Sequence, residues 1–382
     1  MLCHPSTDLY GSDRMAVLTA AGLQELGCIV DLVVPSTTGK IERFAAEQNV
    51  TIVRCDILTL RKTLVSARGL IKVVLDLPRS IMRATRLILD TKPDVIYVNT
   101  IIQPVWLIAS IIARRPSVVH VREAETSASK IARLAITAPL LLAGSIICNS
   151  AATQRFVAGN LLWQKESNVV YNGKRWEDYR LSPDVQPKGT EASVRLIAVG
   201  RLSPRKGQDV LLESFSHLLA DGYDCTLDLV GNEFPGYEWF VDDLHEIARR
   251  LKIENRVNFR GYLEDVPAAL AGADIAVVPS RIEPFGSVAA EAMAAGLPVV
   301  VTDADGLSEI VSHLITGIVV KRDNAQALSE GLKVLLDDTN LSARIAKNGS
   351  DFVSTTFSMS SYLNDVHEIL KRAGKLNLIR ER

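Results

Sequence analysis

The sequence lacks several features that would mark a specialised class of protein. Its five cysteines are odd in number, irregularly spaced and without a Cys-x-x-Cys pair, which excludes a disulfide scaffold and indicates free thiols in a reducing compartment. Only 23 of the 382 residues are glycine and 15 are proline, so a collagen-like or low-complexity chain is excluded. No apolar run reaches the roughly 20 residues that span a bilayer, and we expect no signal peptide.

The charges balance over the whole chain but not within it. The 43 basic and 44 acidic residues give a net charge of −1, which argues against a nucleic-acid partner. Residues 1–185 contain 22 Lys/Arg and 16 Asp/Glu, whereas residues 186–382 contain 21 and 28. We therefore expect the two halves to face different partners.

Short β-branched runs alternate with longer helical patterns along the chain. The runs are apolar throughout, as in strands buried on both faces, and the alternation predicts βαβ units with parallel sheets. They cover residues 29–34, 51–54, 95–99, 117–121 and 145–148 in the first half, and residues 195–199, 225–230, 257–259, 275–278, 298–301 and 318–320 in the second.

A polar segment with two prolines and no apolar period, residues 173–193, predicts a linker. We therefore expect an α/β fold with two doubly wound domains, residues 1–172 and 194–357. Residues 358–382 begin with an amphipathic helix that could cross back to the first domain. Its apolar stripe comprises Met359, Tyr362, Leu363, Val366, Ile369 and Leu370. Ligands of such sheets bind beyond the carboxyl ends of the strands.

The richest loop of the second half is PSRIEPFGSVAAEAMAAG, residues 279–296. It follows an apolar strand, and a helix of small residues is expected to start near Gly286 and to end at Gly296. The unpaired amides at this helix start would suit a phosphate. Glu283 lies just before the helix and Glu291 inside it, and carboxylates suit vicinal sugar hydroxyls. The alternative is a capping acid and a solvent-facing helical acid.

A second loop, AVGRLSPRKG at residues 198–207, brings cations to the end of another strand. Arg201, Arg205 and Lys206 would suit a bound anion, since arginine contacts phosphate through two N–H groups and lysine as a point charge. The lysine is followed by Gly207 and Gln208, so this is not a Walker A loop. The alternative is a solvated basic turn.

These loops resemble the carboxyl-terminal domain of glycosyltransferase family four, whose members are retaining enzymes of the GT-B fold. The resemblance runs from GRLSPRKG through EPFGSVAAEAMAAGLPVVVTDADGLSEIV, and VVYNG at 169–173 and TGIVV at 316–320 are also similar to family segments. Glu283 and Glu291 match the family's Glu-x7-Glu spacing. The resemblance implies two Rossmann-like domains that face a cleft and a nucleotide-diphosphate sugar as donor.

The resemblance also implies roles for these residues. Glu291 would hold the hydroxyls of the nucleotide ribose, and Glu283 would contact the donor sugar. The remaining groups would stabilise the diphosphate leaving group, because fixed charges and dipoles favour the charge that develops in a transition state. They are Arg201, Lys206 and the amides of Phe285, Gly286, Ser287 and Val288.

The first half matches the family more loosely. YGSDRMAVLTAAGLQELG at residues 10–27 resembles the family's first loop and helix, which implies that Gly11 and Ser12 approach a substrate. His120 closes a buried strand in SVVHVREAE, and the resemblance implies that it contacts the donor sugar; Arg122 and Glu123 are weaker candidates in the same loop. The alternative for His120 is a core histidine whose nitrogens are bonded to the protein.

The basic surplus of the first half is concentrated in residues 61–90. This span contains seven Lys/Arg residues interleaved with leucine, isoleucine and valine. A basic amphipathic helix suits an anionic membrane surface, and this would bring the enzyme to a lipid-linked acceptor. The alternative is a solvated helix face.

We therefore expect a retaining, metal-independent glycosyltransferase that transfers a sugar to a glycan or lipid-linked acceptor in the synthesis of cell-envelope or surface polysaccharide. It would need no cofactor, bind no nucleic acid and act in the cytoplasm, with peripheral contact at the inner face of the membrane. Asp303 and Asp305 form a D-x-D pattern, which we do not expect to bind metal. A catalytically inactive nucleotide-sugar-binding subunit is the alternative. The donor base, sugar and acceptor stay open.

Overall fold

The computed structural model describes residues 1–60, 67–124, 126, 128–179, 193–233, 236–263 and 265–380. The chain divides into two compact units. The first consists of Met1–Gly173 together with Met359–Arg382, and the second of Lys174–Ser358. Most of the expected linker, residues 180–192, lies outside the described residues, as do residues 61–66 of the basic span.

The first unit is built on a seven-stranded parallel sheet with the order β3-β2-β1-β4-β5-β6-β7. The strand order turns at β1, which pairs with β2 on one side and β4 on the other. The strands are β1 (Leu2–Cys3), β2 (Asp31–Val34), β3 (Thr51–Arg54), β4 (Ile96–Val98), β5 (Ser117–Val121), β6 (Ser145–Cys148) and β7 (Ser167–Val169).

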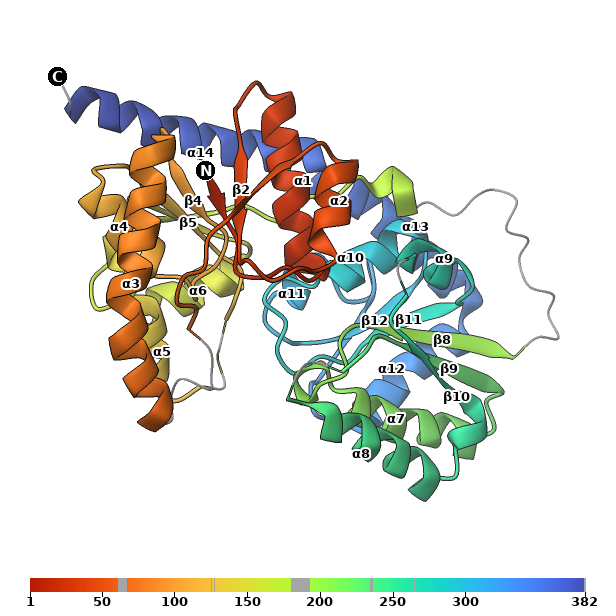
Figure 1. Ribbon diagram of the computed structural model, residues 1–382. Helices are drawn as coiled ribbons and strands as arrows, with labels where there is room; N and C mark the ends of the chain where they lie inside the picture. Colours follow the sequence, from red (N-terminus) through yellow and green to blue (C-terminus); the bar gives the residue numbers. More distant parts are fainter. Residues whose placement is uncertain are drawn as a thin grey trace. The chain divides into compact units, whose positions relative to one another are not determined.

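Helices cover both faces of this sheet, as in doubly wound folds. One core contains side chains of α1, α2 and α14, and the other contains side chains of α3, α4 and α6. The helices are α1 (Gly11–Glu25), α2 (Ile41–Glu47), α3 (Ala67–Thr91), α4 (Val105–Ile112), α5 (Lys130–Thr137), η2 (Ala138–Leu142), α6 (Ala151–Ala158) and α14 (Met359–Arg380). Figure 1 shows α3 and α4 side by side.

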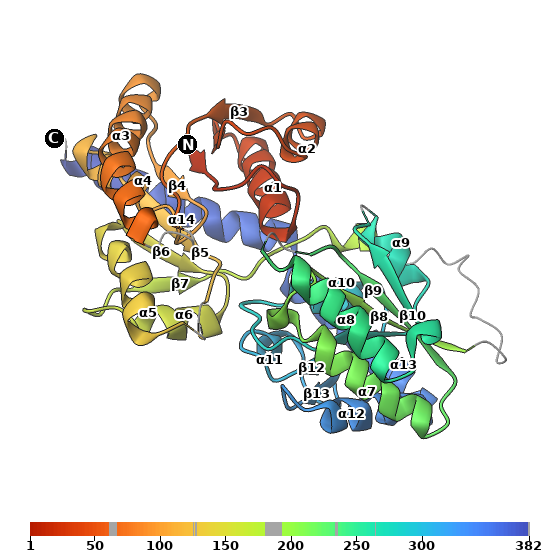
Figure 2. The same cartoon turned by 60° about the horizontal axis from the view of Figure 1, so that its bottom comes forward.

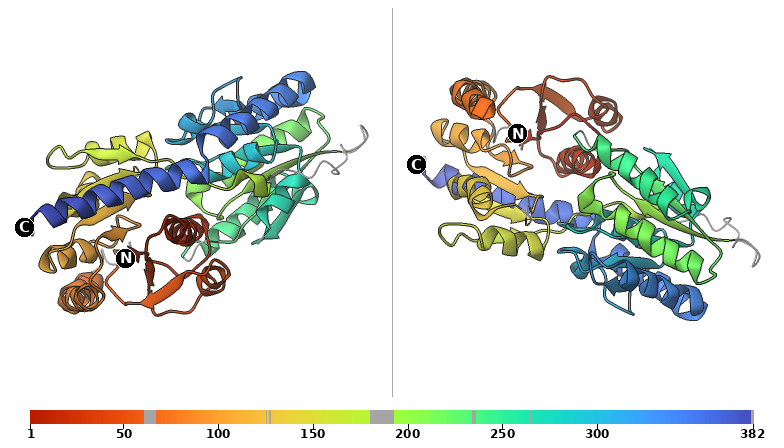
Figure 3. Two further views of the ribbon diagram at one scale, coloured as in Figure 1. Left: turned by 90° about the horizontal axis from the view of Figure 1, so that it is seen from above. Right: turned by 90° about the horizontal axis from the view of Figure 1, so that it is seen from below.

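Helix α14 is the last segment of the chain, yet it completes the first core. All six residues of the apolar stripe expected for it belong to this core or pack against it. Figure 3 shows α14 running along the first unit next to α1. The contact is close, because a Cβ on Gly22 of α1 would lie 2.2 Å from a methyl carbon of Leu363.

The second unit has a six-stranded parallel sheet with the order β10-β9-β8-β11-β12-β13. One face is covered by α7, α8 and α12, whose apolar residues form one core with the sheet (Figure 2). The strands are β8 (Val194–Val199), β9 (Cys225–Val230), β10 (Val257–Gly261), β11 (Ile275–Val278), β12 (Val299–Thr302) and β13 (Ile318–Val320).

Most helical segments of this unit connect successive strands, whereas η3 precedes β8, and α12 and α13 follow β13. Helix α10 packs on β11 and β12, and α13 packs on α10. The segments are η3 (Trp176–Tyr179), η4 (Pro204–Lys206), α7 (Gln208–Ala220), α8 (Glu238–Arg250), η5 (Glu254–Arg256), α9 (Val266–Ala271), α10 (Ser287–Ala294), α11 (Leu307–Ile310), α12 (Ala325–Asp337) and α13 (Thr339–Thr356).

These two sheets confirm the predicted fold class. Every apolar run named above overlaps a strand, and six of the eleven match its bounds, among them Thr51–Arg54 and Ile275–Val278. Strand β7 was missed, because Ser167–Val169 contains only one apolar residue. Within the described ranges, no helix is long and apolar enough to cross a membrane.

Candidate functional site

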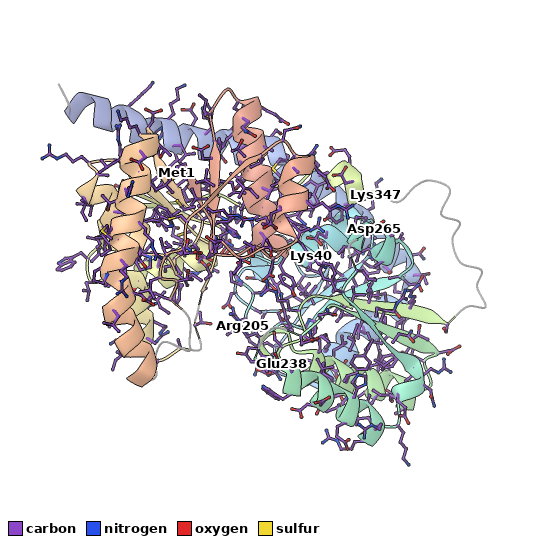
Figure 4. All side chains as sticks on the ribbon, in the orientation of Figure 1. Met1, Lys40, Arg205, Glu238, Asp265 and Lys347 are labelled. Atoms are coloured by element: carbon purple, nitrogen blue, oxygen red, sulfur yellow. The ribbon has the colours of Figure 1, made fainter. Side chains whose placement is uncertain are left out.

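The candidate residues of the second unit lie on loops that follow β8, β11 and β12. The carboxyl ends of parallel strands meet at one edge of a sheet, so these loops are neighbours. Gly200 and Arg201 follow β8 and lead into η4, where Figure 4 labels Arg205. Pro279 to Gly286 connect β11 to α10, and Asp303 to Gly306 connect β12 to α11.

The cation and the acid predicted on two different loops form an ion pair. The Lys206 ammonium donates to a carboxylate oxygen of Glu283 at 2.5 Å. The same oxygen accepts from the Ser280 hydroxyl at 3.2 Å. The Glu283 side chain is only 12% exposed and that of Lys206 25%. Both charges are therefore fixed at the sheet edge while part of each still reaches solvent.

Arg281 ties these two loops together. Its guanidinium binds the Asp209 carboxylate through two hydrogen bonds of 2.8 and 2.7 Å and donates to the Pro204 carbonyl oxygen at 2.6 Å. Its amide donates to the carbonyl oxygen of Arg205 at 2.8 Å. The hydrogen bonds to Asp209 raise the pKa of Arg281. The loop after β11 therefore fixes the segment that carries Lys206.

Glycine allows the backbones of these loops to approach closely. Gly207 has φ +68°, and a Cβ built there would lie 2.1 Å from the carbonyl oxygen of Pro279. No side chain fits at that distance, so Gly207 lets the backbone next to Lys206 lie directly against the backbone at the end of β11.

Helix α10 begins where the sequence predicts. Gly286 caps it with φ 106°, and the first helical residue is Ser287. The described hydrogen bonds give the amides of Ser287 and Val288 no acceptor, as expected for a first helical turn. Phe285 is buried and packs edge-on against Phe357, with ring centroids 5.6 Å apart. A rigid helix start with open N–H groups therefore follows Glu283.

Glu291 has a partner that the sequence did not indicate. It lies on α10, is 7% exposed and forms an ion pair with Lys174. Lys174 also donates to the Tyr179 hydroxyl at 3.0 Å. Burial opposes the charge of Lys174, but the Glu291 carboxylate and the Tyr179 hydroxyl together outweigh it, so the pKa of Lys174 is raised. The pair joins residues 117 positions apart, and no local pattern could have revealed it.

The D-x-D pattern after β12 has structural partners. Asp303 accepts from the Arg322 backbone and side chain at 2.9 and 3.1 Å. Asp305 lies 3.7 Å from the Arg322 guanidinium and accepts from the Glu283 amide at 3.4 Å. Both aspartates therefore shape the loops around Glu283.

The first unit exposes Gly11 and Ser12 at the start of α1. A Cβ on Gly11 would meet nothing within 4 Å, so this end of the helix is open to a ligand. The amide of Tyr10 donates to the Asp13 carboxylate at 2.7 Å and closes the cap. Gly11 and Ser12 lie where the sequence placed them, at a helix start beyond the short strand β1.

His120 does not close its strand, because β5 continues to Val121. Its ring is fully buried, and Nδ1 lies 2.6 Å from the Tyr97 hydroxyl and 3.3 Å from the Arg122 guanidinium. Burial and the neighbouring Arg122 charge lower the pKa of His120 well below its ordinary value. Nδ1 therefore has partners, as in the alternative of a core histidine, but Nε2 is buried with no hydrogen-bond partner among the described residues. The contact of His120 with the donor sugar stays a prediction.

Arg122 is the first residue after β5, and it organises buried polar groups. Its guanidinium donates to the Asn99 amide oxygen at 2.7 Å and to the Tyr362 hydroxyl at 2.8 Å, and it also binds Asn172. The Tyr362 hydroxyl lies 2.8 Å from that of Thr19. Arg122 therefore joins β4, α14 and the segment before Gly173.

Comparison with known proteins identifies the family. Residues 185–352 match the sequence family described as glycosyl transferases group 1, and residues 10–173 match glycosyltransferase family 4. The chain belongs to these glycosyltransferases, which confirms the resemblance seen in the sequence.

Among solved structures, the chain is similar to Anabaena HepE, which was crystallised with UDP and glucose. The two are 26% identical, with a TM-score of 0.83 over 97% of this chain and 98% of the other. Sucrose-phosphate synthase of Thermosynechococcus elongatus, at 18% identity and a TM-score of 0.79, shows the shared fold alone.

Curated relatives match over shorter segments. A lipopolysaccharide core biosynthesis glycosyltransferase of Rhizobium meliloti is 27% identical over 59% of this chain and 63% of its own length. An uncharacterised glycosyltransferase of Methanocaldococcus jannaschii is 31% identical over 54% of each chain. The chain thus spans about half of the length of the curated relatives that it matches.

Proposed function

We propose that this protein is a retaining, metal-independent glycosyltransferase that uses a UDP-sugar and a glycan or lipid-linked acceptor. The observation that carries the proposal is the arrangement of Lys206, Glu283 and the start of α10 at one sheet edge. The choice of UDP is supported by the similarity to HepE, whose structures contain UDP, UDP with glucose, or UDP-glucose.

In this proposal each group has a distinct task. Glu291 accepts hydrogen bonds from the ribose, and Glu283 accepts them from the donor sugar. Lys206, Arg201 and the amides of Ser287 and Val288 stabilise the charge that develops on the diphosphate. The bond between the sugar and the diphosphate breaks, and the acceptor oxygen bonds to the same face of the sugar. The acceptor proton passes to the departing phosphate.

A thermal-shift panel of UDP-, GDP-, dTDP- and ADP-sugars tests the donor assignment. We expect the largest stabilisation with a UDP-sugar, because a ligand that binds only the folded state raises the melting temperature. Release of UDP from that sugar then separates an enzyme from a catalytically inactive nucleotide-sugar-binding subunit. A shift without any turnover, with or without candidate acceptors, would favour the inactive subunit.

The acceptor side of the proposal rests on helix α3. Leu75, Met82 and Leu89 are 59%, 66% and 55% exposed and lie seven residues apart, so they share one helix face. Arg79 and Arg86 fall between them on the same face. Exposed apolar residues with interleaved arginines suit an anionic membrane surface, where a lipid-linked acceptor would be found. We therefore propose that the protein works in the cytoplasm against the inner face of the membrane.

Flotation with vesicles tests this surface. We expect the protein to float with vesicles that contain phosphatidylglycerol and not with neutral ones. The double variant Met82→Glu/Leu89→Glu should stay in the soluble fraction, because it places two negative charges on this face. Val334→Glu, at an exposed position of α12 in the second unit, is the matched control and should still float. Equal flotation of all variants would remove the membrane proposal.

A further inference from the structure

Lys174 and Glu291 form a buried ion pair in the second unit. Their side chains are 12% and 9% exposed. Removal of two charges from water is costly, so a buried pair persists only where its geometry is good and other hydrogen bonds support it. Tyr179 supplies such support, because its hydroxyl accepts from the Lys174 ammonium and its ring lies 5.1 Å from that nitrogen.

The backbone around Lys174 is fixed independently of Glu291. The Lys174 amide donates to the carbonyl oxygen of Phe357 at 3.2 Å, and Lys174 forms a parallel β-bridge with Ser358. The indole of buried Trp176 donates to the same carbonyl oxygen at 2.7 Å. These contacts fix the backbone of Lys174 without help from Glu291, and the position of the Lys174 ammonium therefore determines where the Glu291 carboxylate lies.

Only one of the two Glu291 oxygens takes part in this pair. Lys174 binds Oε1, and the described residues provide no partner for Oε2. If Oε2 were fully buried, it would be a buried oxygen without a hydrogen bond, and among the described residues it is not one of those atoms. The second oxygen is thus an oriented acceptor that solvent, or a ligand, can reach.

We propose that Lys174 is a positioning residue of the donor site, which fixes Glu291 so that its free oxygen accepts a hydrogen bond from a ribose hydroxyl of the donor nucleotide. The inference rests on the proposed function, because it takes Glu291 as the ribose acceptor. Lys174 itself contacts neither the ribose nor the diphosphate. Lys174 keeps the Glu291 side chain in one rotamer. Without Lys174, the carboxylate would rotate to another hydrogen-bond partner.

The test compares the affinity for UDP with that for 2′,3′-dideoxy-UDP by calorimetry. The unmodified protein should bind UDP about tenfold to a hundredfold more tightly, because a hydroxyl donating to a carboxylate makes a strong hydrogen bond. Lys174→Met should lose most of this preference through weaker UDP binding, with dideoxy-UDP binding unchanged. Lys174→Arg should keep most of it. Lys347→Met, on exposed α13 (Figure 4), is the matched control.

Glu291→Met, which leaves no hydrogen-bond acceptor at this position, separates failure of this inference from failure of the proposed function. If Glu291→Met still prefers UDP, Glu291 is not the ribose acceptor and the proposed site is wrong. If Glu291→Met loses the preference and Lys174→Met keeps it, only the positioning role is wrong. An equal loss of affinity for both nucleotides in Lys174→Met would indicate a general structural effect and would also overturn the inference. Should Lys174→Met fail to fold, Lys174→Gln replaces it with the same criteria.

Discussion

The close approach of Gly207 to Pro279 allows a quantitative prediction for the variant Gly207→Ala. The residue has φ +68°, and its added Cβ would lie 2.1 Å from the Pro279 carbonyl oxygen. Alanine in the left-handed region costs about 1–2 kcal/mol. In addition, the two backbones must separate by about 0.9 Å to reach 3.0 Å, a distance below which Cβ contacts are essentially absent.

That displacement falls on the segment that carries Lys206, next to Gly207 in the chain. A misplacement of about 1 Å can cost roughly a hundredfold in rate. We therefore expect Gly207→Ala to lower the turnover of a UDP-sugar, measured as UDP release, about a hundredfold. The backbone strain of about 1–2 kcal/mol should lower the melting temperature by a few degrees, and the separation of the two backbones should lower it further.

Gly222→Ala is the matched control, since Gly222 has φ +90° and nothing within 4 Å of an added Cβ. It incurs the same backbone strain in the same unit without the clash. Its melting temperature should therefore fall as well, while UDP release stays near that of the unmodified protein. If both variants release UDP at the same rate, the contact with Pro279 does not position Lys206 and the reasoning is refuted.

Three further predictions concern the site and the buried histidine. Glu283→Ala and Arg201→Ala should each lower turnover about a hundredfold or more with the circular dichroism spectrum preserved; near-normal rates would contradict the site. UDP release should survive a chelator, whereas a loss that Mn²⁺ restores would show a metal requirement. The pKa of buried His120 lies below its unfolded value of 6.5, so protonation of the unfolded chain should reduce stability below that pH by up to about 1.4 kcal/mol per unit. Urea denaturation between pH 7 and pH 5.5 should therefore show a shallower loss of stability for His120→Gln, and an identical slope would contradict this.

The features predictable from the sequence are those with a local cause. Strands such as Ile275–Val278 are continuous apolar runs, and the start of α10 follows from Pro284, Gly286 and the small residues after them. The pairing of Lys206 with Glu283 was not predicted, but both residues were placed at the same sheet edge, because parallel strands bring their carboxyl ends together.

The features that sequence reasoning missed depend on contacts between distant segments. Lys174 belongs to a polar stretch interpreted as linker, and only the fold brings it to Glu291. The bounds of β5 were predicted, but the contact of the His120 ring with Tyr97 on the neighbouring strand was not. Neither contact leaves a periodic signal in the chain.

The membership of α14 in the first unit has a consequence for biosynthesis. Residues of α14, including Tyr362, Leu363, Val366 and Ala373, close a core whose other members come from the first half of the chain. The ribosome must therefore translate the entire second unit before the first can bury that surface, whereas Lys174–Ser358 is continuous. A premature stop codon after Ser358 would thus damage the half of the molecule that was translated first.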